Sequence, residues 1–182
     1  FVVLLFLAFA IDGITPQVCL AGGEIGVDWA TTTPFAPRTG HTSVIFNGRI
    51  WVIGGHYADT WSSPDGKDWD PVNTDAAFGE IVGHTSVVFN GKMWVIGGGY
   101  RNSFNSSVWS STNGIDWNIE TSSPKFGERT SAASVVYDGK IWVIGGNDGY
   151  NKHYNDVWYS SDGKSWTQAT SGAAFASAAQ DP

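Results

Sequence analysis

The side chains best able to bind a ligand collect in three polar segments of unequal length. These segments read HYADT (56–60), GYRNSFNSSV (99–108) and NDGYNKHYNDV (147–157). Aromatic faces beside amides and carboxylates suit sugar hydroxyls or a polar protein surface, and tyrosine gives contact area at low entropy cost. The alternative is that they are ordinary solvated loops. We expect ligand-binding residues here, and the candidates are Tyr57, Arg101, Asn102, Asn147, Asp148, Tyr150 and His153.

The four histidines fall into two groups, two beside the apolar runs and two in the polar segments. His41 and His84 stand directly before two similar apolar runs, but Ala132 takes that place before a third run. This pattern favours a packing role for the two residues over metal ligation. His56 lies in the first polar segment, where it could contact a ligand, as could His153.

Two arginines also recur at matching positions. Arg38 and Arg129 precede the first and third apolar runs, and Ile81 replaces them in the middle. Arginine can hold a sugar carboxylate with two parallel hydrogen bonds, but the recurrence favours a structural arginine. The sequence shows no Ser-His-Asp arrangement and no glycine-rich phosphate loop, and Asn147-Asp148-Gly149 is too short for a calcium loop. We therefore expect no catalytic residue, metal or other cofactor in this chain.

The segments that must position these residues repeat three times. WVIGG occurs at 51–55, 94–98 and 142–146, so that the copies begin 43 and 48 residues apart. Such a period indicates a β-propeller or a similar array of sheets. All ten tryptophans fall into three places of the repeat, which favours packing over sugar stacking. The number of residues between WVIGG and the next tryptophan varies among the repeats, whereas the two tryptophans of the following hairpin are always equally far apart. Insertions therefore occur at the same connection of every blade, and we expect the variable segments on one face.

Each repeat predicts four short strands joined by tight turns. Asn47-Gly48, Asn90-Gly91 and Asp138-Gly139 suit type I′ turns, which need positive φ at both central residues. They join runs of Val, Ile, Phe and Trp that barely alternate, so both faces of these strands are expected to be buried. A second, more polar hairpin turns at Asp65-Gly66, Asn113-Gly114 and Asp162-Gly163 and is expected further out.

This order of apolar strand, turn, WVIGG and paired tryptophans resembles the kelch repeat over about residues 29–175. The resemblance implies an all-β fold, a β-propeller of four-stranded blades that usually number six or seven. Three complete repeats, at about 36–78, 79–126 and 127–175, predict a fragment of such a ring. The strand around Trp29 and the run before Phe175 suit incomplete neighbouring blades. Dimerisation into a six-bladed ring is the alternative, with self-association through unpaired blade faces.

The resemblance also raises two enzymatic possibilities. Galactose oxidase is a kelch-propeller enzyme whose copper site needs a Cys–Tyr cross-link, and the single Cys19 lies outside the repeats. The turn Ser63-Pro64-Asp65-Gly66-Lys67-Asp68-Trp69 is similar to the Asp-box of sialidase-type propellers but is one residue short. We interpret it as a convergent hairpin turn. Part of a carbohydrate-active enzyme, such as a sugar oxidase, mutarotase or sialidase, remains the alternative function.

The N-terminal segment indicates in which compartment the protein is located. Residues 1–11 are almost wholly apolar, and Cys19 and Ala21 are small residues that suit cleavage after Ala21. We expect a signal peptide over 1–21 with a truncated start, although a buried strand or helix is the alternative. The run is too short to span a membrane, and a net charge of −7 argues against nucleic-acid binding. The sequence thus predicts a secreted or cell-surface binding module, extracellular or periplasmic, with a protein or glycan partner.

Overall fold

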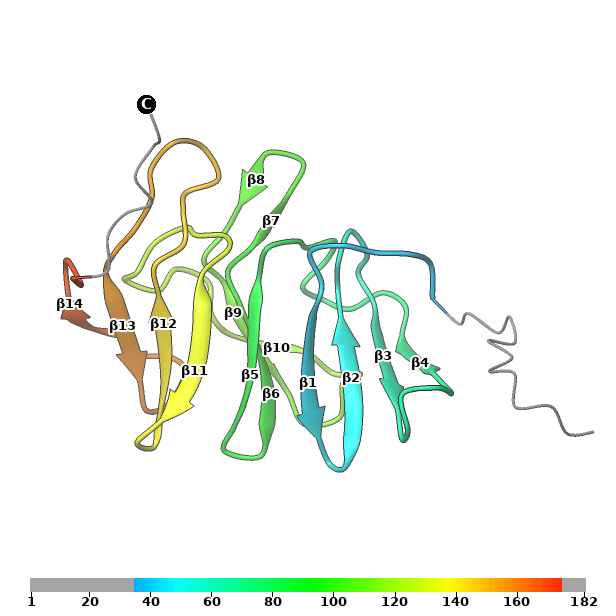
Figure 1. The fold of residues 1–182 in the computed structure, drawn as a ribbon. Helices are drawn as coiled ribbons and strands as arrows, with labels where there is room; N and C mark the ends of the chain where they lie inside the picture. The colour runs from blue at the N-terminus through cyan, green and yellow to red at the C-terminus, as the bar shows by residue number, and fades with distance from the viewer. Residues whose placement is uncertain (1–34, 175–182) are drawn as a thin grey trace, which may run out of the picture. The chain divides into compact units, whose positions relative to one another are not determined.

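A computed structural model describes residues 35–174, which fold as an all-β array of three four-stranded antiparallel sheets (Figure 1). The predicted signal peptide, the strand around Trp29 and the run around Phe175 lie outside the described residues. We call each sheet a blade. Within the described range no helix is long and apolar enough to cross a membrane.

The strands of each blade follow chain order from the first to the fourth, apart from one inserted hairpin. The first blade contains β1 (Thr42–Phe46), β2 (Arg49–Ile53), β3 (Thr60–Ser63) and β4 (Asp70–Asn73). The second contains β5 (Thr85–Phe89), β6 (Lys92–Ile96), β9 (Val108–Ser111) and β10 (Asn118–Thr121), and its inserted hairpin is β7 (Gly99–Tyr100) with β8 (Ser103–Phe104). The third contains β11 (Ala133–Tyr137), β12 (Lys140–Ile144), β13 (Val157–Ser160) and β14 (Thr167–Thr170). The predicted four-stranded antiparallel blades are therefore confirmed.

The turn between the first two strands of each blade has the predicted backbone. Asn47, Asn90 and Asp138 all have φ of 48°, and the glycine after each has φ of 65–71°. Positive φ at both central residues is the geometry of a type I′ turn, whose twist matches that of the strands it joins. The turn dipeptides therefore set the register in which Trp51, Trp94 and Trp142 pair with Val44, Val87 and Val135.

The second hairpin of each blade is held by a side-chain turn. In the first blade Ser63 Oγ accepts hydrogen bonds from the amides of Asp65 and Gly66, at 3.2 and 2.7 Å. Asp65 Oδ1 accepts two further amides, and the Trp69 indole donates to the Gly66 carbonyl at 3.1 Å. The same pattern recurs around Ser111 and Ser160. Serine and aspartate here replace backbone pairing, as in other Asx and ST turns.

Apolar side chains fill the spaces between neighbouring blades. Trp51, Ile53 and Phe46 of the first blade pack against Met93 and Val95 of the second. In the second interface the equivalent set Phe89, Trp94 and Ile96 packs against Ile141, Val143 and Trp166 of the third blade. Each blade therefore offers two different apolar faces, and only the middle blade has both covered by described neighbours.

Burial of the inner strands follows from this stacking. In β6, four of the five residues are buried, as the sequence predicts for a strand sandwiched between sheets. In β11, by contrast, Val135 and Tyr137 are exposed, and in β1 Ile45 is 74% exposed. The expectation that both faces are buried is thus wrong for the third and the first blade, because each has one face with no described neighbour.

Candidate functional site

The three variable segments leave their blades through the same backbone geometry. The glycine pairs at 54–55, 97–98 and 145–146 have φ values of 65° and 88°, 64° and 93°, and 60° and 93°. In each pair the first amide donates to a carbonyl at the far end of the loop, that of Asp59, Ser107 or Asp156, at 3.0 Å. The loops therefore emerge at one edge of the array, opposite the type I′ turns (Figure 1). We call this edge, formed by 54–59, 99–105 and 147–154, the loop face.

The middle loop is an ordered hairpin. Gly99 pairs with Phe104 and Tyr100 with Ser103, and the tip residues Arg101 and Asn102 have φ of 48° and 65°. The sequence predicts only a variable loop here, since Arg-Asn is an uncommon pair for positive φ and does not indicate a hairpin. The consequence is that Arg101 and Asn102 stand at the tip of a projecting hairpin, where their side chains are exposed.

The third loop uses two of the predicted site residues for its own shape. Asp148 Oδ1 accepts the amides of Tyr150 and Lys152, at 2.9 and 3.1 Å. These bonds, that from Tyr150 first, lower the pKa of Asp148. Asn147 Oδ1 accepts the Gly149 amide at 2.8 Å, while its backbone pairs with Thr130. Asn147 and Asp148 are thus occupied within the loop, which leaves Tyr150 projecting with 67% of its surface exposed.

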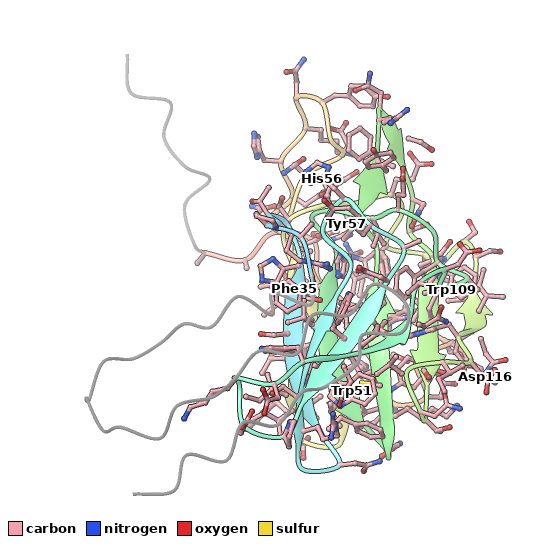
Figure 2. All side chains as sticks on the ribbon, turned by 90° about the vertical axis from the view of Figure 1, so that its right-hand side faces the viewer. Phe35, Trp51, His56, Tyr57, Trp109 and Asp116 are labelled. Atoms are coloured by element: carbon pink, nitrogen blue, oxygen red, sulfur yellow. The ribbon has the colours of Figure 1, made fainter. Side chains whose placement is uncertain are left out.

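Aromatic side chains connect the loops of all three blades. The ring of His56 lies edge-on to Tyr100 with centroids 5.9 Å apart, and Phe104 lies edge-on to Tyr150 at 5.4 Å. Tyr100 and Phe104 belong to the same hairpin, and the Tyr150 hydroxyl donates to the Asn102 carbonyl at 3.5 Å. We call His56, Tyr100, Phe104 and Tyr150 the aromatic row. Figure 2 shows His56 and Tyr57 near the upper end of the molecule, far from Trp51.

The structure brings only some of the predicted site residues together. The Asn102 carbonyl lies beside the Tyr150 hydroxyl, whereas Arg101 lies over Tyr100, with its guanidinium 5.0 Å from the centre of that ring. His153 is exposed, and its backbone bridges to Asn147 at the base of the third loop. Sequence reasoning did not select Tyr100 and Phe104, because only the hairpin pairing reveals that they link the loops.

Tyr57 has a position defined by the repeat. Its ring lies 4.9 Å from the guanidinium of Arg38, as the ring of Tyr154 lies 4.6 Å from that of Arg129. Tyr57 and Tyr154 each stand four residues before the tryptophan that opens the second hairpin. Tyr57 therefore packs on the framework and offers its outer surface, 38% exposed, to the loop face.

The recurring arginines are buried ion-pair partners. Arg129 is 1% exposed, and its guanidinium donates to both carboxylate oxygens of Asp156, at 2.9 and 3.3 Å, and to the carbonyls of Gly145 and Phe126. Arg38 makes the equivalent bonds to Asp59, at 2.6 and 3.0 Å, and to Gly54. The remaining Arg129 donor, Nε, is buried without a partner, so neither arginine is placed to hold a sugar carboxylate, and the structural interpretation is confirmed.

The ion pair of the third blade changes the pKa of Asp156. Burial alone would raise the pKa of Asp156, but hydrogen bonds from Arg129 and from the Trp158 indole outweigh it and lower the pKa. In the second blade Ile81 replaces the arginine, and Ser107 stands where the other blades have Asp59 and Asp156. Both charges are absent together, so neither is left buried without a partner.

His84 is a packing residue, as the repeat pattern predicts. Its side chain is buried, and Nε2 lies 2.8 Å from Thr42 Oγ1 of the neighbouring blade. Burial lowers the pKa of His84 to about 4, so the ring is neutral near pH 7. His41 is exposed, and its Cβ closely approaches Gly55. Across residues 35–174, no cluster of three or more His, Cys, Asp or Glu side chains is placed to hold a metal ion.

Stacked four-stranded blades with one shared loop edge define a protein of the β-propeller class. The kelch motif model matches residues 37–65, 81–110 and 128–172, one match for each blade, and the chain belongs to the kelch-repeat family. Among solved structures the chain is similar to YjhT, with a TM-score of 0.63 and 21% identity. The match covers 76% of this chain and 53% of YjhT, so the chain spans about half the length of that structure. No curated protein sequence matches the chain.

Proposed function

We propose that the chain is a secreted or cell-surface binding module that recognises a polar ligand, a glycan or a protein surface, through the loop face. The aromatic row is the observation behind this proposal, because ring contacts tie the middle hairpin to the loops on either side and leave His56 and Tyr150 exposed. Kelch propellers commonly bind proteins, which supports a binding role over a purely structural one. The N-terminal apolar run supports secretion.

The chemistry of the loop face fits a polar ligand. Tyr150 offers an exposed ring on which a sugar or a peptide side chain can stack, and its packing on Phe104 holds the ring in place. Arg101 offers a planar fork of donors that matches a carboxylate. Rigid aromatic anchors beside adaptable polar groups are typical of surfaces that bind proteins or glycans.

A carbohydrate-active enzyme remains the alternative and would need a positioned acid or base in this face. Asp148 is the carboxylate of the third loop, and its Oδ1 already accepts two amide hydrogen bonds that lower its pKa. A group in that state is a weak proton acceptor. Asp148 is therefore poorly suited as a general base, and the enzymatic alternative would draw its catalytic residues partly from other blades.

The test uses the intact chain on an array of neutral and sialylated glycans, followed by titration calorimetry with the sugars that bind. Tyr150→Ala and Arg101→Ala should each weaken binding at least tenfold. Ile119→Ala is the control, because Ile119 is also exposed (48%) but lies in β10, away from the loop face. Equal affinity for all three variants would remove the loop face as the site.

Protein ligands require a second measurement. The chain immobilised through its C-terminus should retain the same partner as the Ile119→Ala variant, and the Tyr150→Ala variant should lose that partner. Sugar turnover by the intact chain, measured as reducing-end release or hydrogen peroxide formation, would support the enzymatic alternative instead. Recovery of the mature protein outside the expressing cell, with Gly22 as its first residue, would test secretion.

A further inference from the structure

Each described blade interface contains the same contact between a tryptophan and a glycine. The ring of Trp51 lies against Gly114 in the turn of the next blade, so closely that a Cβ built on this glycine would collide with it. Trp94 lies against Gly163 in the same way. The tryptophan thus acts as a plug that enters a socket formed by the glycine turn of the following blade.

The plug of the third blade meets no socket among the described residues. Trp142 is equivalent to Trp51 and Trp94, but it is only partly buried, and its indole N–H still donates to the Tyr137 carbonyl at 3.0 Å. Tyr137 is 70% exposed, whereas its equivalents Phe46 and Phe89 are 5% and 6% exposed. We call the surface of Val135, Tyr137, Trp142, Ile144 and Tyr159 the plug face.

The socket of the first blade holds no tryptophan among the described residues. A Cβ built on Gly66 would meet, among the described residues, only Ile50 Cδ1 at 3.6 Å. Ile50 is 36% exposed, whereas its equivalents Met93 and Ile141 are fully buried, and Ile45 beside it is 74% exposed. We call Gly66, Ile45 and Ile50 the socket face.

We propose that a second copy of this chain covers these faces head to tail, with Trp142 of one copy against Gly66 of the other. The interface would continue the two that already exist within the chain, because its halves are the same repeat positions. Contacts between different patches of identical chains are heterologous, and they form a closed ring when the rotation closes. Two copies would supply six blades, within the roughly four to eight of known propellers.

Two further observations favour a second copy. The plug face has Tyr159 where the interior faces have the buried Ser62 and Ser110, and Tyr137 where they have phenylalanine. Tyrosine tolerates both water and burial and is enriched at interfaces between separate proteins.

The experiment blocks each face separately with a charge. Tyr137→Lys blocks the plug face and Ile50→Lys blocks the socket face. The unmodified chain, at about 100 μM and therefore well above a micromolar dissociation constant, should sediment at twice the mass of the 19.6-kDa chain. Each variant alone should sediment as a monomer. An equimolar mixture of the two should form a dimer again, because one intact plug meets one intact socket.

Control variants keep the result interpretable. Ile119→Lys places the same charge on the outer strand β10 of the middle blade, where Ile119 is 48% exposed, and should leave the dimer intact. Ile45→Lys is the second socket variant, in case Ile50→Lys unfolds the chain, and circular dichroism reports folding for each. A monomeric unmodified chain would overturn the proposal and indicate that another blade or partner covers the faces. Dimers that resist the socket variants, or a mixture that stays monomeric, would overturn it as well.

Discussion

The third blade has the ion pair Arg129–Asp156 where the second blade has Ile81 and Ser107. Replacing the pair with isoleucine and serine tests why the two charges are present or absent together. Arg129→Ile removes a guanidinium that is 1% exposed and leaves Asp156, whose side chain is 14% exposed, without its partner. Breaking a buried pair in this way costs about 3–5 kcal/mol. Because Asp156 retains some contact with water, we expect about 3 kcal/mol.

The double variant Arg129→Ile/Asp156→Ser should recover much of this loss. Ile81 and Ser107 show that a blade of this family folds with that combination, with Ile81 fully buried against its neighbours. The Gly145 and Phe126 carbonyls still lose a donor, and this leaves a residual cost of about 1–2 kcal/mol. The double variant should therefore be about 1–2 kcal/mol more stable than Arg129→Ile alone.

Urea denaturation followed by tryptophan fluorescence measures the four free energies of unfolding in this cycle. A double variant no more stable than Arg129→Ile alone would refute the reasoning. The pH dependence gives an independent check. The lowered pKa of Asp156 stabilises the native chain above the ordinary value of 3.8, and this contribution disappears as the pH falls through the folded pKa. The difference between the native chain and Arg129→Ile should therefore shrink below about pH 4.

Three further outcomes are expected from the same structure. Stability should decline by up to about 3 kcal/mol between pH 6.5 and 4, because the buried His84 ring excludes the proton that the unfolded chain accepts, and His84→Gln should flatten this part of the pH profile. Gly163→Ala should lower the urea midpoint more than Gly139→Ala, since both have positive φ but only Gly163 touches a tryptophan ring. Calorimetry should show a loss of about 3–5 kcal/mol for Trp94→Ala and less than about 0.5 kcal/mol for Tyr150→Ala.

The framework could be predicted from the sequence because its determinants are local and repeated. Asn47-Gly48 and its equivalents specify the turn, and the fixed places of the tryptophans reveal the contacts between blades. The pairing of Arg38 with Asp59 was not predicted, because the partners are 21 residues apart and both lie beside polar loops. Only the folded blade brings them together.

The candidate site was less predictable for a related reason. Residue type alone does not show whether a polar side chain is already occupied, and Asn147 and Asp148 turned out to shape their own loop. The hairpin containing Tyr100 and Phe104 has Arg-Asn at its tip, a pair that gives little indication of positive φ. The aromatic row depends on that hairpin.

The hydrogen bond at the base of each loop explains how the loops vary while the blades do not. It joins Gly54 to Asp59, Gly97 to Ser107 and Gly145 to Asp156, and thus closes intervals of 5, 10 and 11 residues. The entropy of loop closure grows only with the logarithm of length, so the longest interval costs about 0.7 kcal/mol more than the shortest. That difference is small beside the burial of a single tryptophan between blades. Residues can therefore be inserted after the glycine pair at little expense to the framework, and the loop face is the part of this chain whose shape is free to follow a ligand.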